Sequence, residues 1–334
     1  MHDEYRGKNK SLVQNMKKIL IIRNDHIGDL VYSTPIFREI KRAMPDSEIT
    51  VIASPSNRPI IEKNPHIDRI IELDIAKKSF SSVLSYFKMS MKLRKEKFDY
   101  GIDLRGSTMN CWFLLKLAGV KRKISHIEWH PNIRGFLDVA LNFNKKAHIF
   151  EDNRALLKMG MGIDIKDDWP EVITDEEDKR IVDTVIKDNN LDKFICVCPI
   201  AGLPEKQWAL ENFRHLIDWL YETYPEHKIV LIGTEKDRYT MQMGLAVPGS
   251  VILVDFNVRR LPLLFKRASL VIAMDGGPLH EAWLTGAKTL ALYPAEVADK
   301  FFPLRNCRTF QSDSTQDMLS IELKDVKKAV GEML

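Results

Sequence analysis

The chain has 334 residues, of which 45% are hydrophobic and 29% are charged, and its formal net charge is +4. One hydrophobic core rarely serves a chain of this length, so we expect two domains, and this ordinary globular composition gives no indication of nucleic acid binding. No apolar run reaches membrane-spanning length, and the opening MHDEYRGKNKSLVQNMKK lacks the apolar segment of a signal peptide, which predicts a cytoplasmic protein.

The first half of the chain predicts a parallel sheet, because apolar runs of strand length alternate with amphipathic helical stretches. Residues 1–16 are predicted to be a flexible tail, and the first domain to span 17–165. Strands are expected at residues 18–23, 48–53, 69–73 and 100–104, with an edge strand at 123–125. Helices are expected at residues 30–44, 80–96, 111–118 and from 149 onward.

The second half repeats this pattern after an acidic, proline-containing stretch, and we interpret residues 166–190 as the linker between domains. The second domain is predicted to span 191–334. Its strands are expected at residues 194–199, 228–233, 251–254, 270–274 and 288–293, and its helices at 210–224, 259–268 and 321–334. Two doubly wound α/β domains that open their strand ends toward a shared cleft would bind ligands there.

The stretch LVIAMDGGPLHEAWLTGAKTLALYP, residues 270–294, is the strongest candidate for a ligand site. Asp275 ends a buried strand, Gly276 and Gly277 permit a tight turn, and a helix then starts, with His280 in its first turn. A helix N-terminus at the carboxyl edge of a parallel sheet favours an anion. An equally supported alternative is that Asp275 only caps the helix and His280 only packs.

Two further loops follow strands of the second half. The loop IAGLPEKQW contains Gly202 and Lys206, and Lys206 is a candidate to neutralise a pyrophosphate, although a solvated surface lysine is the more common case. The loop GTEKDR places Glu235 where an acidic residue accepts hydrogen bonds from a ribose, or caps the next helix. No GxxxxGK[ST], strand-linked GxGxxG or HExxH occurs, which argues against a P-loop protein and a zinc hydrolase.

In the first half, the loop after the first strand reads NDHIGD. Gly28 lets the backbone turn closely, and Asp29 sits at a helix start, where it is either an ionised base or an N-cap. His26 is the rival base, because its usual pKa of about 6.5 is closer to neutrality. The spacing leaves both open. Arg105, at the end of the strand YGIDL, is the residue that we expect to bind a carboxylate or phosphate of a substrate.

The segment RNDHIGDLVYSTPIFREIKRAMPDSEITVIA, the loop ending in EKQW and the turn MDGGPLHEAWLTGAKTLALYP together resemble glycosyltransferase family 9, the heptosyltransferases of lipopolysaccharide core assembly. The likeness spans nearly the whole chain. It implies the GT-B fold, with two Rossmann-like doubly wound parallel-sheet domains facing a central cleft. It also implies inverting transfer from ADP-heptose with neither metal nor cofactor.

Carried over by position, Asp29 matches the base that deprotonates the acceptor hydroxyl, and Lys206 the lysine at the donor's phosphates. Gly276 stands where the family usually has Ser or Thr, and the IAGLPE loop lacks the family's hydroxyl residue. Our candidate donor residues are Gly202, Lys206, Glu235, Asp275, Gly276, Gly277 and His280, our candidate acceptor residues are His26, Gly28 and Arg105, and our candidate catalytic residues are Asp29 and Lys206.

The sequence thus predicts a glycosyltransferase whose partners are a nucleotide-diphosphate sugar, expected to be ADP-heptose, and a lipid-linked anionic oligosaccharide of the lipopolysaccharide core. Basic residues gather at 77–97 and 121–123, and would attract that acceptor or give peripheral contact with the inner membrane, unless they are only solvated helix faces. The alternatives are a nucleotide-sugar epimerase of the same fold and a non-catalytic nucleotide-sugar binding protein.

Overall fold

The computed structural model describes residues 16–74, 80–127, 131–142, 144, 147–295, 306–314 and 317–334. All of the predicted tail except Met16 lies outside these residues. The chain divides into two compact units, Met1–Glu171 and Val172–Leu334. The division falls inside the stretch 166–190 that we interpreted as a linker.

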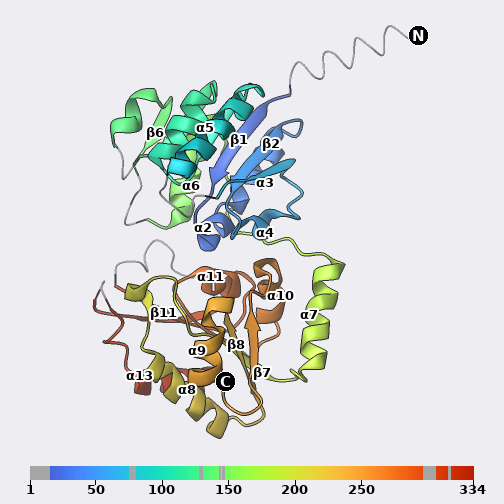
Figure 1. The fold of residues 1–334 in the computed structure, drawn as a ribbon, viewed down its shortest axis with the longest axis vertical. Helices are drawn as coiled ribbons and strands as arrows, with labels where there is room; N and C mark the ends of the chain where they lie inside the picture. Colours follow the sequence, from blue (N-terminus) through green and yellow to red (C-terminus); the bar gives the residue numbers. More distant parts are fainter. Residues whose placement is uncertain are drawn as a thin grey trace, which may run out of the picture. The chain divides into compact units, whose positions relative to one another are not determined.

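The first unit is built on a parallel sheet, and the described residues contribute six strands in the order β3-β2-β1-β4-β5-β6 (Figure 1). Its centre is β1, whose residues Ile19 to Ile22 are fully buried, as expected for a strand covered by helices on both faces. The strands are β1 (Lys18–Arg23), β2 (Glu48–Ala53), β3 (Arg69–Glu72), β4 (Tyr100–Asp103), β5 (Arg122–His126) and β6 (Val139–Leu141).

The sequence placed β5 at the sheet edge, and this was wrong, because β6 pairs with β5 on its outer side. The short strand β6 carries too little pattern to be seen in the sequence. The helices of this unit are α2 (Ile27–Val31), α3 (Thr34–Ala43), α4 (Arg58–Ile61), α5 (Phe80–Arg94), the π-helix η1 (Asn110–Leu117), the 3₁₀ helix η2 (Pro131–Phe136) and α6 (Ile149–Met161).

The single helix predicted at residues 30–44 is divided into α2 and α3. Pro35 has no N–H to donate to the carbonyl of Val31, four residues earlier. The Thr34 hydroxyl donates to that carbonyl instead, at 2.8 Å, and the Ser33 hydroxyl donates to Asp29 O, also at 2.8 Å. The break makes α2 a short, separate helix that presents Asp29 directly after β1.

The second unit has the same construction, with six described strands in the order β12-β11-β10-β7-β8-β9. The strands are β7 (Phe194–Cys198), β8 (Lys228–Gly233), β9 (Val251–Val254), β10 (Leu270–Met274), β11 (Thr289–Tyr293) and β12 (Cys307–Gln311). The edge strand β12 was not predicted. Cys196 and Cys198 face the same side of β7, since both pack in one hydrophobic cluster while Val197 packs in the other.

The helices of the second unit are α7 (Glu176–Asp188), η3 (Pro204–Lys206), α8 (Leu210–Thr223), η4 (Glu235–Asp237), α9 (Arg238–Thr240), η5 (Met241–Leu245), η6 (Val258–Arg260), α10 (Leu261–Phe265), α11 (Gly277–Leu284) and α13 (Leu323–Met333). Helix α7 lies inside the stretch interpreted as a linker. A capping box of Asp175 and Asp178 begins it. Asp178 is fully buried and accepts hydrogen bonds from Arg259 at 2.8 and 3.0 Å and from Arg260 at 2.9 Å.

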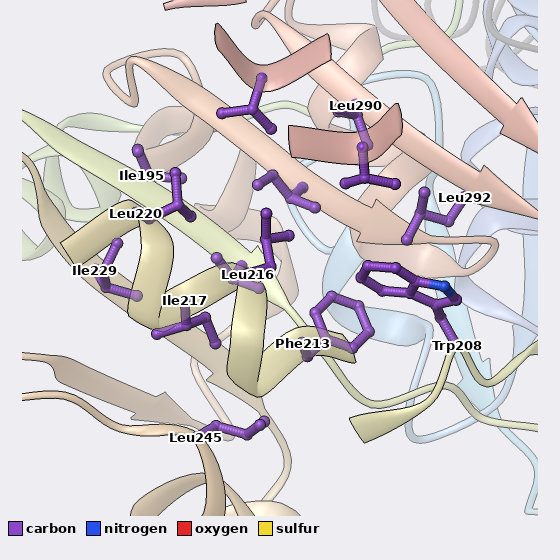
Figure 2. Packing of buried hydrophobic residues seen from close by; sticks show 14 of the residues in the cluster. Ile195, Trp208, Phe213, Leu216, Ile217, Leu220, Ile229, Leu245, Leu290 and Leu292 are labelled. Atoms are coloured by element: carbon purple, nitrogen blue, oxygen red, sulfur yellow. The ribbon is translucent and has the colours of Figure 1, made fainter. Parts of the chain in front are cut away.

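One core of this unit lies between the sheet and helices α8 and α13. Figure 2 shows Phe213, Leu216 and Leu220 of α8 directed at the sheet, with Trp208 beside Leu292. The rings of Trp208 and Phe213 meet edge to face at 5.0 Å. The indole N–H of Trp208 donates to Ile321 O at 2.9 Å. This bond holds the segment before α8 against the segment before α13.

Candidate functional site

The three candidate donor loops follow three adjacent strands of the second unit. Strand β7 pairs with β10 on one side and with β8 on the other, all in parallel. The loops after these strands therefore emerge at the same carboxyl edge of the sheet, the usual ligand edge of such sheets. They carry Lys206, Glu235 and Asp275.

Asp275 and Lys206 come together as an ion pair, with 2.6 Å between Lys206 Nζ and Asp275 Oδ2. His280 Nε2 lies 3.5 Å from the other oxygen, Asp275 Oδ1. Asp275 and His280 are buried, whereas the Lys206 side chain is 24% exposed. The alternative that Asp275 caps α11 is excluded, because the N-cap residue is Gly276 and no side chain caps this helix.

The carboxylate of Asp275 is held in its ionised form. Burial alone would raise its pKa, but the hydrogen bond and charge of His280 and the charge of Lys206 outweigh burial, so the pKa of Asp275 is lowered. A buried anion thus holds an ammonium group beside the first turn of α11. This arrangement orients Lys206 toward the place where the dipole of α11 and its free backbone N–H groups favour an anion.

The glycines at the two ends of α11 differ in whether the backbone conformation requires glycine. Gly276 has φ of 170°, an extended conformation that any residue adopts, and an added Cβ would meet only Met274 O at 3.8 Å. The turn therefore does not require glycine at position 276, and a serine would fit. Gly286, in contrast, has φ of +73° just after α11, a conformation that favours glycine where a helix ends.

The loop that carries Gly202 and Lys206 is organised by Gln207, a residue whose part the sequence did not reveal. Gln207 Oε1 accepts from Ala201 N at 2.9 Å, and its Nε2 donates to Pro199 O at 2.9 Å and to Trp208 O at 2.7 Å. Gly202 is exposed, and an added Cβ there would meet nothing within 4 Å. The side-chain amide therefore closes the loop and places Lys206 opposite Asp275.

Glu235 follows β8 and is exposed, and its carboxylate binds Arg238 Nε at 2.7 Å and Nη2 at 2.9 Å. The hydrogen bond from Arg238 lowers the pKa of Glu235. Capping of the following helical turn belongs instead to Thr234 and Asp237, which form a capping box. The capping alternative for Glu235 is therefore excluded, and both oxygens of its carboxylate are bound by Arg238 at the sheet edge.

Glu281, the residue after His280, is the unexpected feature of this loop. Its side chain is fully buried, and neither carboxylate oxygen has a hydrogen-bond partner among the described residues. Burial raises the pKa of Glu281 well above the usual value, so the group is neutral over a wider pH range than an exposed glutamate. It also lies close enough to Cys198 to help raise the pKa of that thiol, after burial itself.

In the first unit, Asp29 is in the first turn of α2 and pairs with Arg23, the last residue of β1. The distance between Arg23 Nη2 and Asp29 Oδ1 is 2.7 Å. Arg23 is buried and is held in turn by Leu104 O, to which its Nη1 donates. The N-cap of α2 is His26, so the capping alternative for Asp29 is excluded as well. The guanidinium fixes the orientation of the carboxylate.

A second carboxylate, Asp25, lies beside the same guanidinium, with 3.4 Å between its Oδ1 and Arg23 Nε. Burial raises the pKa of Asp25 to about 6, the charge of Asp29 adds to the rise, and Arg23 and Arg105 oppose it. Arg105 is thereby placed near Asp25, as expected from the pairing of β1 with β4. Arg23 and Asp25 were not among the predicted site residues.

The other predicted acceptor residues lie after β1, at His26 and Gly28, and after β4, at Arg105. His26 is exposed, and Gly28 is buried within α2. The loop that carries Arg105 is held by Asp103, which is fully buried and accepts from Ser107 N and Asn110 Nδ2, each at 2.9 Å. Burial dominates these hydrogen bonds and raises the pKa of Asp103.

The basic residues of this unit divide into two groups. Lys121 pairs with Asp99 at 2.9 Å and Lys123 with Asp138 at 2.8 Å. This group therefore binds carboxylates that directly precede the neighbouring strands β4 and β6. The other group, on and just after α5, lies on an exposed face, whereas Lys77 and Lys78 lie outside the described residues.

No described helix is long and apolar enough to span a membrane. The described residues also contain no cluster of three potential metal ligands from His, Cys, Asp and Glu.

Comparison with known proteins decides the family. The model of glycosyltransferase family 9 (heptosyltransferase) matches residues 86–329. The chain belongs to this family. It is therefore a glycosyltransferase, and the resemblance seen in its sequence is confirmed.

Relatives and solved structures agree with that assignment. Lipopolysaccharide heptosyltransferase 3 of Escherichia coli is 23% identical over 283 residues, which cover 80% of this chain and 81% of the relative. A glycosyl transferase family 9 structure from Veillonella parvula has a TM-score of 0.80 at 22% identity, covering 95% of this chain and 97% of that one. The structure of Escherichia coli ADP-heptose lipopolysaccharide heptosyltransferase II has a TM-score of 0.75 at 19% identity, covering 95% and 98%. These likenesses confirm the predicted GT-B fold.

Proposed function

We propose that this family 9 enzyme transfers heptose from ADP-heptose to a lipopolysaccharide inner-core acceptor, with inversion and without a metal, at the cytoplasmic face of the inner membrane. The observation that supports the proposal is that each unit holds one charged group in a fixed position and that the two groups suit opposite tasks. Asp29 is a carboxylate oriented by its ion pair with Arg23, and Lys206 is an ammonium held beside the start of α11 by Asp275. The first suits a base and the second a phosphate ligand.

In the proposed reaction, Asp29 accepts the proton of the acceptor hydroxyl, whose oxygen forms the new bond to the anomeric carbon. The bond from that carbon to the pyrophosphate oxygen breaks, and the electron pair leaves with ADP. Lys206 and the N-terminus of α11 stabilise the charge that develops on the leaving diphosphate. We assign the ribose to Glu235 and the loop backbone around Gly202, Gly276 and Gly277 to the phosphates.

The acceptor is assigned to the first unit. Arg105, beside Asp25 and held by the Asp103 loop, is proposed to bind an acceptor carboxylate or phosphate, while His26 and the backbone at Gly28 contact the sugar next to Asp29. An ADP-heptose donor is supported by the related Escherichia coli enzyme, whose description names that donor. It is also compatible with a phosphate site built from Lys206 and backbone N–H groups.

The experiment compares Asp29→Asn with His26→Gln in transfer assays with ADP-heptose and a lipopolysaccharide core acceptor. Loss of general-base catalysis costs about 10²- to 10⁴-fold, so Asp29→Asn is expected to lower kcat by that factor with donor affinity nearly unchanged. His26→Gln should cost far less, because His26 is exposed. An inactive histidine variant beside an active asparagine variant would make the imidazole the base.

The same assay separates the alternatives. A nucleotide-sugar epimerase of this fold would convert the donor in the absence of acceptor, and a binding protein would retain the donor without turnover. Either result with the wild-type chain would refute the proposed transfer reaction.

A further inference from the structure

Helix α5 in the first unit is anchored by one face and leaves an apolar face exposed. Tyr86 and Leu93 are buried, and Tyr86 packs against Phe113 of η1 with ring centroids 5.8 Å apart. Val83, Leu84 and Phe87 of the same helix are 42%, 44% and 46% exposed. These three residues fall at positions i, i+1 and i+4, so they share one side of the helix. A cluster of large exposed apolar side chains of this kind indicates an interaction surface.

The charge beside this apolar face has only one sign. Lys88 and Lys92 are exposed and follow Leu84 at i+4 and i+8, so they form a stripe along its edge. The sequence FSSVLSYFKMSMKLR of α5 contains no acidic residue, and neither does NCWFLLKL of η1. The exposed surface of α5 is therefore apolar on one half and basic on the other.

The neighbouring helix η1 has the same combination. Trp112 is 46% exposed, and Lys116 Nζ lies 4.2 Å from the centroid of its ring and 4.7 Å from that of Phe136. Tryptophan and lysine with this relationship are typical of membrane interfaces, where the ring lies among headgroups and the ammonium reaches the phosphates.

We propose that this α5 surface, defined as Val83, Leu84, Phe87, Lys88 and Lys92 of α5 with Trp112 and Lys116 of η1, docks the enzyme on a bilayer of anionic lipids. Helices that lie in the plane of a membrane combine an apolar face with a lysine-rich polar face in this way. A protein partner would need acidic groups to match the three lysine charges, since neither helix carries an acidic residue, whereas an anionic bilayer supplies both the negative surface and the apolar interior.

The inference rests on the proposed function for its purpose, since a lipid-linked acceptor would be presented at such a surface. The docking itself can be measured without it. Each lysine near an anionic membrane contributes about 1 kcal/mol, which changes the affinity for the membrane about fivefold. Removal of two lysines should therefore reduce the affinity for vesicles about 25-fold.

The experiment measures co-sedimentation of the full chain with phosphatidylcholine vesicles and with vesicles that also contain phosphatidylglycerol, in the absence of any donor. The wild-type chain is expected to bind only the anionic vesicles. The variant Lys88→Gln/Lys92→Gln should lose binding to the anionic vesicles about 25-fold, and Leu84→Ser/Phe87→Ser should also lose binding to them, although it keeps both lysines. The matched control Lys179→Gln/Lys187→Gln removes two exposed lysines from α7 with the same change of net charge, and should bind like wild type.

Activity toward a water-soluble, deacylated acceptor distinguishes loss of docking from loss of catalysis. Both α5 variants are expected to keep wild-type turnover with this acceptor, because neither pair of residues belongs to the proposed donor, base or acceptor groups. Equal loss of vesicle binding in the α7 control, wild-type binding by both α5 variants, or no preference for anionic vesicles would overturn the proposal. Absence of heptosyl transfer by the wild type would refute the proposed function and leave the docking result standing.

Discussion

Replacing Glu281 should make the second unit more stable, although the residue lies next to His280. Its carboxyl group is fully buried with both oxygens unpaired among the described residues. Leaving a buried polar group without a partner costs about 1–3 kcal/mol. Glu281→Leu removes that cost with a side chain of similar size, so we expect stabilisation of this order at low pH, where the carboxyl is protonated in the folded and the unfolded chain, and a larger one as the pH rises. Glu281→Gln keeps the unpaired polar group and removes only the ionisation.

The pH dependence follows from the raised pKa of Glu281. As the pH rises above about 4.3, the unfolded chain releases this proton while the folded chain retains it. Stability therefore falls with rising pH, by about 1.4 kcal/mol per pH unit, for as long as the carboxyl stays protonated in the fold. The glutamine variant has no such loss, so its advantage over wild type should grow by about 2.7 kcal/mol over two such pH units.

The assay is urea unfolding of wild type, Glu281→Gln and Glu281→Leu at several pH values between 5 and 8. Glu222→Gln, which neutralises an exposed glutamate on α8, is the matched control and should track wild type. Because every other titrating group is common to all variants, its contribution cancels in the difference. Parallel curves for wild type and Glu281→Gln would show that the carboxyl is ionised and compensated in the fold, and the reasoning would be wrong.

Two further predictions concern the charged pairs of the second unit. Lys206→Ala should lower turnover more than it weakens donor binding, because the negative charge it meets grows as the glycosidic bond breaks; a raised donor KM with unchanged kcat would contradict this. Asp178→Asn should destabilise the unit by about 3–5 kcal/mol in urea unfolding, because Arg259 and Arg260 lose their shared buried carboxylate. Burial alone would raise the pKa of Asp178, but its hydrogen bonds with the two arginines outweigh burial and lower it, so this stabilisation should be lost as the pH falls toward that pKa; a loss under about 0.5 kcal/mol would contradict the prediction.

The sequence predicted the central strands of both sheets and one edge strand of each, β3 and β9, but it missed the opposite edge strands, β6 and β12. Strands β1 and β10 are buried on both faces and appear as unbroken apolar runs of strand length. Strand β6 has only three residues and β12 mixes polar with apolar residues, and both are only partly buried, so their pairing depends on the neighbouring strand more than on their own pattern. The break between α2 and α3 was similarly hidden, since its signal is one proline inside an otherwise helical pattern.

The sequence also predicted only some of the residues of the candidate site. The sequence named Asp29, Lys206 and Asp275 because each stands at a strand end, and the structure brings Lys206 and Asp275 to 2.6 Å. It did not name Arg23, because the last residue of an apolar strand carries no sign of which loop its side chain will reach. That residue lies 2.7 Å from Asp29 and so determines the orientation of the proposed base. A charged side chain that closes a buried strand must find a partner at the sheet edge, where ligands also bind. Such residues are therefore candidates for holding a site in place even where no motif includes them.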